Sequence, residues 1–416
     1  MAHTPDHLES LSPGERIRVL RESRGMSRPV LAGLCGRGPD WLKKIERGDR
    51  ELRSHTQLMR LAAALQLPDV SLITGGIPEA VQPVPLGRLT HPALPEIWAA
   101  VMRRQLGPRD EEQPVDVAAL QARVDQTWRL WHSSTRQRTE VGTLLPDLIR
   151  DTEVAARASN STSRRRALVA LADVYRLTAQ ATAYVAPSEL AWVVVDRALS
   201  AAQEADDPAA IAAAAWSMAN IVRETAYPEE ALRVVTDAAD ILRPHLADAP
   251  EDWRGLYGAL QLHAAVTSAR EGREGDAWRF WDSGDQTAKS LPAGYVHPST
   301  VFGRANTDFH AVSVATDLRV ARRALSIADD LAPDTMPSTE RRARLWVEVA
   351  RGHLQRGDRT AALHVMVMAH EISSETVAFT PSARGVTADL WRRAPRALRP
   401  EAARLAEAIG IAPEHG

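Results

Sequence analysis

The chain has 416 residues, which is too long for one small domain and predicts two or three. The formal net charge is −2, so the protein as a whole is no polyanion binder and any basic surface must be local. Its single cysteine, Cys35, excludes a disulfide framework and an all-cysteine metal site. No apolar stretch approaches the length of a membrane span, and the first residues lack the regions of a signal peptide, so we expect a cytoplasmic protein.

Helix signals begin near residue 12. Ser12 is the expected N-cap of a first helix, with Pro13 at N1 and Glu15 reaching back from N3 as a capping box. Gly25 ends this helix, and Ser27 caps the second one. We expect the second helix to bury an apolar set: Val30, Leu31 and Leu34.

A tight turn, Gly36-Arg37-Gly38, separates the second helix from a third. Pro39 opens the third helix, in which Leu42 and Ile45 face inward, and Gly48 ends it. A second capping box precedes a fourth helix, and its residues are Ser54 and Gln57, followed by the apolar Leu58, Leu61 and Leu65. Helices of this size form a bundle that can place one helix in a major groove of DNA.

These residues resemble the helix-turn-helix of the Xre and phage-repressor family. The resemblance implies that the third helix reads DNA, with Lys44 as the best candidate for a guanine edge, and that Arg21 and Glu46 form a buried ion pair. Three roles stay open for Trp41: a core residue, part of the groove wall, or a contact for a thymine methyl group. The alternative for the whole segment is four helices that pack together without reading DNA. The DNA contacts implied for this chain are Arg28, Arg37, Asp40, Trp41, Lys43, Lys44, Arg47 and Arg53.

Composition changes after residue 74. Residues 75–87 are rich in Pro and Gly, and residues 105–114 are polar and charged, with a helix carrying Trp98 between them. We therefore expect a DNA-binding domain over residues 1–74, a linker with a helix over 75–113, and a helical domain over 114–416.

Small residues recur at a regular spacing in the third region. Five pairs are seven residues apart, and their first members follow one another by 40, 46, 44 and 41 residues: Ala191 with Ala198, Ala231 with Ala238, Ala277 with Gly284, Ala321 with Ala328, and Ala362 with Ala369. The pattern resembles tetratricopeptide repeats, in which small residues let two helices cross closely, although their usual period is about 34. We expect an all-α fold: a helix-turn-helix bundle followed by a tetratricopeptide-like solenoid of five helix pairs from about Arg164 to Ser374. An earlier pair spans Val115 to Ala158, and a capping helix lies near Pro400 to Ile409. A generic helical bundle is the alternative.

In the repeats that this pattern resembles, the first helices face a concave groove. Asn220 and Asn306 are candidates to clamp a peptide backbone, and Arg223 and Arg351 to hold a carboxylate. Solvated polar residues on helix faces are the alternative. The groove candidates are Arg176, Gln180, Trp216, Asn220, Arg223, Asn306, His310 and Arg351. Two tryptophan pairs with i, i+3 spacing are expected to pack between repeats: Trp128 with Trp131, and Trp278 with Trp281.

The order of the two domains resembles that of peptide-sensing regulators of Gram-positive bacteria and of actinobacterial Xre-type regulators. The resemblance implies a nucleoid-associated homodimer on double-stranded DNA with a palindromic operator, and a peptide or small-molecule effector. Phosphate loops, nucleophile turns and metal-binding pairs are absent from the sequence, so we expect no enzyme, metal or cofactor. One rival is a scaffold whose repeats bind a protein partner while the head tethers it to the chromosome. The other is a regulator whose repeats serve only dimerisation.

Overall fold

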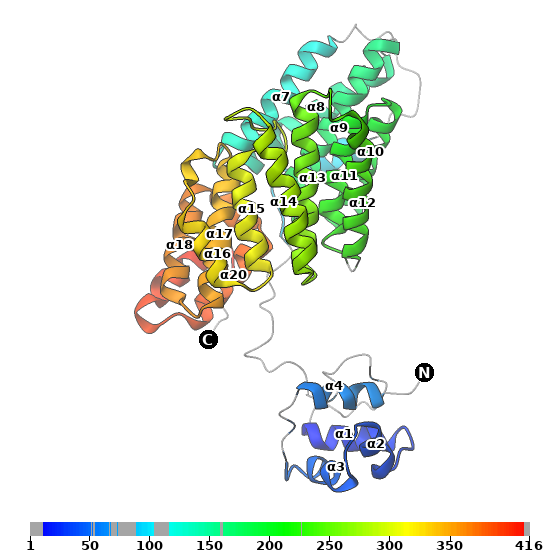
Figure 1. Cartoon of the computed structure of the whole chain (residues 1–416), viewed down its shortest axis with the longest axis vertical. Coiled ribbons are helices and arrows are strands. Elements are labelled where there is room, and N and C mark those ends of the chain that lie inside the picture. The colour runs from blue at the N-terminus through cyan, green and yellow to red at the C-terminus, as the bar shows by residue number, and fades with distance from the viewer. Residues whose placement is uncertain are drawn as a thin grey trace. The chain divides into compact units, whose positions relative to one another are not determined.

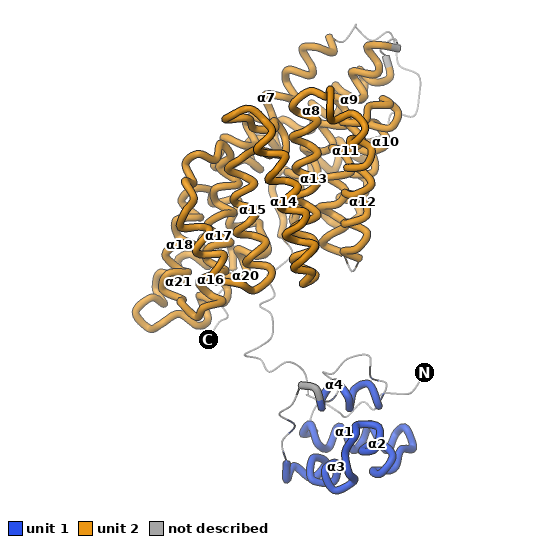
Figure 2. Tube along the Cα trace, in the orientation of Figure 1, with its two compact units in different colours: residues 1–85 blue, residues 86–416 orange. Residues whose placement is uncertain are grey.

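The computed structural model describes residues 11–50, 52, 55–65, 67, 73, 89–103, 116–158, 161–225 and 227–411. Every regular element in these ranges is a helix, so the all-α prediction is confirmed. The chain divides into two compact units, residues 1–85, called the head, and residues 86–416, called the body (Figure 2). None of the helices in the described ranges is both long and apolar enough to cross a membrane.

The head contains α1 (Pro13–Glu22), α2 (Arg28–Leu34), α3 (Pro39–Glu46) and α4 (His55–Ala64). The capping box of α1 is present, because the Ser12 N–H donates to the Glu15 carboxylate at 2.8 Å and the Glu15 N–H donates to the Ser12 hydroxyl at 3.4 Å. The predicted box at Ser54 lies outside the described residues. The head core consists mainly of Ile17, Leu20, Leu31, Leu42, Ile45, Leu61 and Leu65.

Helix α2 differs from its prediction. Only Leu31 of the three expected core residues is buried, whereas Val30 is 52% exposed and Leu34 is 60% exposed. Val30 and Leu34 are four residues apart and therefore share one face, while the inner face of this short helix is filled by Leu31 and Ala32. Helix α1 packs close to the backbone of α3, since a Cβ at Gly14 would lie 2.1 Å from the carbonyl oxygen of Ile45.

The body is a series of helices, most of which are joined by short connections (Figure 1). In chain order these are α6 (Leu94–Met102), α7 (Val117–Ser133), α8 (Gln137–Ala158), α9 (Ser161–Thr182), α10 (Ser188–Glu204), α11 (Pro208–Val222), α12 (Pro228–Leu242), α13 (Glu251–Arg270), α14 (Glu274–Ser290), α15 (Arg304–Asp317), α16 (Ala321–Asp329), α17 (Thr339–Gln355), α18 (Arg359–Ile372), α19 (Ser374–Phe379), α20 (Pro381–Arg393) and α21 (Arg399–Ala408). Three short 3-10 helices cover Arg243–His245, Pro333–Thr335 and Arg396–Leu398. Helix α6, expected inside a linker, instead packs on α8 and buries Ile97 and Val101 in the body core.

Consecutive helices of the body pack in pairs, and the pairs follow the predicted spacing. Helices α9 to α18 form five pairs, α7 with α8 is the earlier pair, and α21 is the closing helix. The first helices of successive pairs also contact one another, from α7 through α17. Small residues allow the close crossings, since a Cβ at Gly284 would lie 2.8 Å from the Leu262 side chain. Of the two expected tryptophan pairs, Trp128 and Trp131 are buried in the core, whereas Trp278 and Trp281 are partly buried against residues of α13 and α15.

The array of pairs turns back on itself, so that the start of α8 meets α19. The Glu375 carboxylate accepts hydrogen bonds from the backbone N–H groups of Arg138 at 2.6 Å and Thr139 at 3.3 Å, which satisfies free donors at the start of α8. Burial opposes ionisation of Glu375, but these bonds and those from His91 and the Thr139 hydroxyl lower its pKa. Helix α7 meets α17 in the same region, where His132 lies 3.3 Å from the Ser338 hydroxyl.

The loop between α14 and α15, residues 291–303, lies against the first helices. Phe302 is fully buried on α13 where Gly258 leaves room, because a Cβ there would lie 2.0 Å from the ring. The Arg176 guanidinium of α9 donates to the Ser299 hydroxyl of the loop at 2.8 Å. The loop therefore ties α9 to α13 across the inner side of the array.

Candidate DNA-binding face and central cavity

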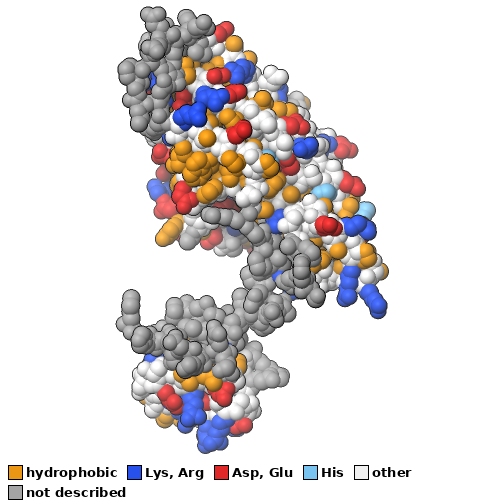
Figure 3. Space-filling view, turned by 180° about the vertical axis from the view of Figure 1, so that it is seen from behind, with side chains coloured by type: hydrophobic (Ala, Val, Ile, Leu, Met, Phe, Trp, Pro, Cys, Tyr) orange, Lys and Arg blue, Asp and Glu red, His pale blue; other side chains and the backbone are white. Residues whose placement is uncertain are grey.

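The head presents a basic face on α3. This helix buries Trp41, Leu42, Ile45 and Glu46, and the opposite side carries Lys43 and Lys44. The predicted DNA-contact residues that lie exposed are Arg37, Asp40, Lys43, Lys44 and Arg47. Lys and Arg side chains protrude from the head in Figure 3. Arg53 lies outside the described residues.

A buried carboxylate organises this face. Glu46, whose side chain is 1% exposed, accepts from Arg21 Nε at 2.6 Å and from Arg21 Nη2 at 3.2 Å, so α1 and α3 are joined by the expected ion pair. The same carboxylate accepts from Arg28 Nε at 2.6 Å. The Arg28 side chain is 40% exposed, so Glu46 holds it while part of it stays open to solvent, an arrangement that the sequence did not predict.

Trp41 does not belong to the exposed face. It is 8% exposed and packs in the head core, so the prediction that it contacts DNA is wrong and the core alternative is correct. The reason is helical periodicity, because Trp41 lies four residues before the buried Ile45 and therefore on the same side of α3.

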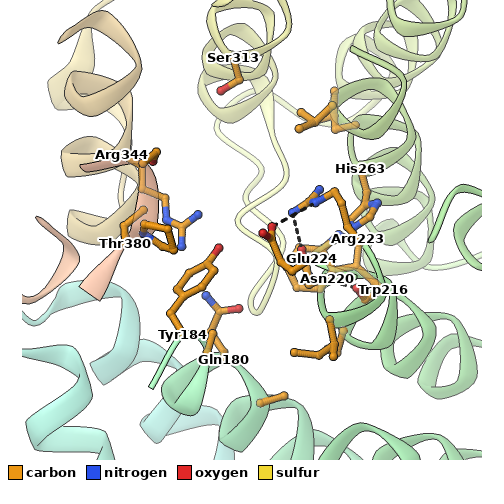
Figure 4. A pocket seen from close by; sticks show the side chains of 18 of the residues that line it. Gln180, Tyr184, Trp216, Asn220, Arg223, Glu224, His263, Ser313, Arg344 and Thr380 are labelled. Atoms are coloured by element: carbon orange, nitrogen blue, oxygen red, sulfur yellow. Dashed lines mark hydrogen bonds and ion pairs between the residues drawn. The ribbon is translucent and has the colours of Figure 1, made fainter. Parts of the chain in front are cut away.

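The body holds a cavity of about 400 Å³ (Figure 4). The first helices α9, α11, α13, α15 and α17 supply most of its wall, together with residues at the start of α20. Six of the eight predicted groove residues line it: Gln180, Trp216, Asn220, Arg223, Asn306 and His310. In Figure 4, Gln180, Tyr184 and Arg344 lie on one side of the space, and Asn220, Arg223 and His263 lie on the other.

The other two groove predictions are wrong. Arg176 is 4% exposed and is held by Asp173 and Ser299 beneath the cavity wall, stacked over Trp128. Arg351 does not line the cavity, and its guanidinium is already paired with two carboxylates, because it donates to Asp317 at 2.7 Å and to Glu348. Sequence spacing placed both on the correct helices, but the rotation of each helix decides which side chains reach the cavity.

Asn220 does not fit its predicted role as a free backbone clamp. Its amide Nδ2 donates to the Trp216 carbonyl at 3.1 Å, and its Oδ1 accepts from Arg223 at 3.0 Å. Asn306 is 4% exposed and lines the cavity, and its Oδ1 is buried without a hydrogen-bond partner among the described residues. The two asparagines are therefore not equivalent.

Burial and positive charge dominate the electrostatics of the cavity. Burial and the neighbouring Arg270 lower the pKa of Arg223 to about 10. Burial and Arg341 lower the pKa of His310 to about 3, and burial with Arg223 and Arg270 lowers that of His263 well below its usual range. Both histidines are therefore neutral near pH 7.

Several cavity residues were missed by the sequence reasoning, and His263 is one of them. It lies on α13, the first helix between those that carry Asn220 and Asn306, so the repeat pattern pointed to this helix although no groove residue was predicted on it. Tyr184 had no repeat signal, because it lies in the turn after α9 with a φ of 69°, in the left-handed region. Arg341 and Arg344 lie at the start of α17, ahead of the repeat residues that sequence analysis identified.

Comparison with known proteins identifies the kind of domain that forms the head. Residues 14–72 match a family described as helix-turn-helix domain, so the chain carries a DNA-binding regulator's head at its N-terminus. No curated protein sequence matches the chain. Among solved structures, BtubC (BKLC) from P. vanneervenii is similar with a TM-score of 0.37 and 12% identity, over 64% of this chain and 94% of that chain. This likeness is too slight to transfer fold or function.

Proposed function

We propose that the protein is a sequence-specific transcription regulator whose body binds an effector, and that it acts by binding and not by catalysis. The observation that carries the proposal is the pairing of a helix-turn-helix head with a body that holds a cavity lined by apolar, aromatic and charged side chains. In the head, α3 would enter the major groove, with Lys44 at a base edge and Arg37 and Lys43 near phosphates. Arg28, held by Glu46, would offer its outer nitrogens to phosphate.

We further propose that the protein binds a palindromic operator as a homodimer. One head of this size covers only a few base pairs, and two-fold pairing of half-sites about one helical turn apart supplies the missing affinity. The body is the larger unit and would hold the two heads at a fixed spacing.

Effector binding is favoured over a protein-scaffold role by the size and lining of the cavity. About 400 Å³ lies within the range of small-molecule sites, and the wall combines aromatic rings with a few convergent polar groups. The proposed dimer would have two conformations that hold its heads differently. A ligand in the cavity would shift the balance between them only by binding one more tightly than the other.

The test is genome-wide footprinting of the full chain, followed by titration of the recovered site with wild-type and Lys44→Ala protein. Palindromic sites bound by a dimer, and weaker binding by the variant, are the expected results. A monomer at micromolar concentration on non-palindromic sites would refute the dimer proposal.

A further inference from the structure

The charged groups of the cavity do not balance. Four guanidinium groups line it, from Arg223, Arg270, Arg341 and Arg344, against three carboxylates, from Glu224, Asp317 and Glu348. All three carboxylates already have partners, because Glu224 accepts from Arg270 at 2.9 Å while Asp317 and Glu348 accept from Arg351.

Arg223 and Arg341 carry the excess charge. The nearest carboxylate oxygen to Arg223 is Glu224 Oε1 at 4.0 Å, beyond hydrogen-bond distance, and its hydrogen bond goes to the neutral Asn220. Arg341 Nε forms an ion pair with Glu340 Oε2 at 3.4 Å but no hydrogen bond, and Arg344 pairs with the other oxygen of the same carboxylate. An added anion strongly stabilises buried guanidinium groups that have no carboxylate of their own.

Two deeply buried side chains of the cavity wall carry acceptor atoms that have no partner among the described residues. Asn306 Oδ1 has no partner among the described residues. The His263 Nδ1 lies 3.3 Å from the Thr267 hydroxyl, whose proton goes to the His263 carbonyl, so Nδ1 carries the ring proton and Nε2 is the bare nitrogen. This Nε2 is also buried without a partner, in a residue that is 4% exposed. Unpaired acceptors of this kind call for a ligand with N–H or O–H donors.

We propose that the cavity binds a small organic anion carrying hydrogen-bond donors, with its acidic group neutralised by Arg223 and Arg341 and its donors accepted by Asn306 and His263. The acid is a carboxylate or a phosphate, and the apolar part of the molecule packs on Trp216 and Phe309, which also line the cavity. This inference rests on the proposed effector role and names the chemistry of the effector.

Matched aromatic probes test the charge requirement on the full chain. Benzoate and benzamide have nearly the same shape but differ in charge, 4-hydroxybenzoate adds a donor, and phenyl phosphate replaces the carboxylate. Binding is measured by saturation-transfer NMR and by titration calorimetry. We expect an anionic probe to bind at least about tenfold more tightly than benzamide. The stronger of benzoate and phenyl phosphate identifies the acid, and 4-hydroxybenzoate should exceed benzoate.

The variants tie this preference to the cavity. Arg223→Gln with Arg341→Gln should reduce the affinity for the anionic probe to that for benzamide. Arg243→Gln removes the same charge from an exposed side chain outside the cavity and should change nothing. The melting temperature of the ligand-free double variant should be unchanged or higher, because mutual repulsion of buried cations is relieved. If that variant fails to fold, Arg223→Lys keeps the charge but loses the planar pair of donors, and should still weaken anion binding.

Equal binding of benzamide and benzoate, undiminished anion binding by the double variant, or no binding of any anionic probe at millimolar concentration would each overturn the inference. DNA binding is measured separately. Probe binding without any change in operator affinity would refute the sensing role and leave the anion site intact. If the protein responds to culture extract but binds none of the anionic probes, the anion site is refuted and the sensing role is left intact.

Discussion

Glu46 offers the sharpest test of how the head is built. Its carboxylate receives Arg21 on one oxygen at 2.6 Å and Arg28 on the other at 2.6 Å, and both Glu46 and Arg21 are almost fully buried. Glu46→Ala leaves Arg21 with the Met26 carbonyl and the half-exposed Glu22 as its acceptors. Removing one partner of a buried pair costs about 3–5 kcal/mol, and these remaining acceptors place the expected cost near the lower end.

Hydrogen exchange of the full chain measures this cost locally. A loss of about 3 kcal/mol predicts roughly 100-fold faster amide exchange in α1 and α3, while body peptides serve as an internal reference and stay unchanged. Glu22→Ala is the matched control, since it removes a carboxylate from the same arginine at an exposed position and should cost under about 1 kcal/mol. Replacing Arg21 and Glu46 together with apolar residues should be milder than Glu46→Ala alone. Unchanged exchange in the Glu46→Ala head would show that the pair does not stabilise it.

Three further predictions concern DNA, packing and pH. Lys44→Ala should weaken operator binding by about 1–3 kcal/mol in anisotropy titrations and leave nonspecific binding nearly unchanged; equal loss on both would contradict base reading. Gly258→Ala should destabilise the body by about 1–3 kcal/mol in calorimetric melts, because its Cβ meets the Phe302 ring, whereas Gly275→Ala, with nothing within 4 Å, should not. The pKa of His310 is about 3 in the folded protein and about 6.5 when unfolded, so the unfolded chain binds the extra proton and stability falls as the pH drops below 6.5. In urea melts, the free energy of unfolding should fall by about 2 kcal/mol between pH 7 and pH 5 because of this residue. The His310→Gln variant should lose about 2 kcal/mol less over the same range. An identical pH dependence of the two proteins would refute the conclusion that His310 is held neutral in the folded protein.

Local signals in the sequence were sufficient for the elements. The Ser12 capping box, the glycine stops and the proline starts act within one helical turn, so α1 to α3 begin and end close to where the sequence predicts. Spacing of small residues likewise predicted the five helix pairs, because each close crossing involves two helices that are adjacent in the chain. The Arg21–Glu46 pair is of a different kind, because the resemblance to the helix-turn-helix family implied it and no signal within one helix did.

The tertiary structure decided which side chains meet across the array. Glu375 caps α8 and Ser299 holds Arg176 only because the pairs accumulate enough rotation for distant helices to return to one another. That rotation is a sum of small angles set by packing at each crossing, and no local signal encodes it. It turns Arg351 of α17 into an internal ion pair and leaves Arg223, the C-cap of α11, facing the cavity with no carboxylate within hydrogen-bond distance, although both carry the same charge.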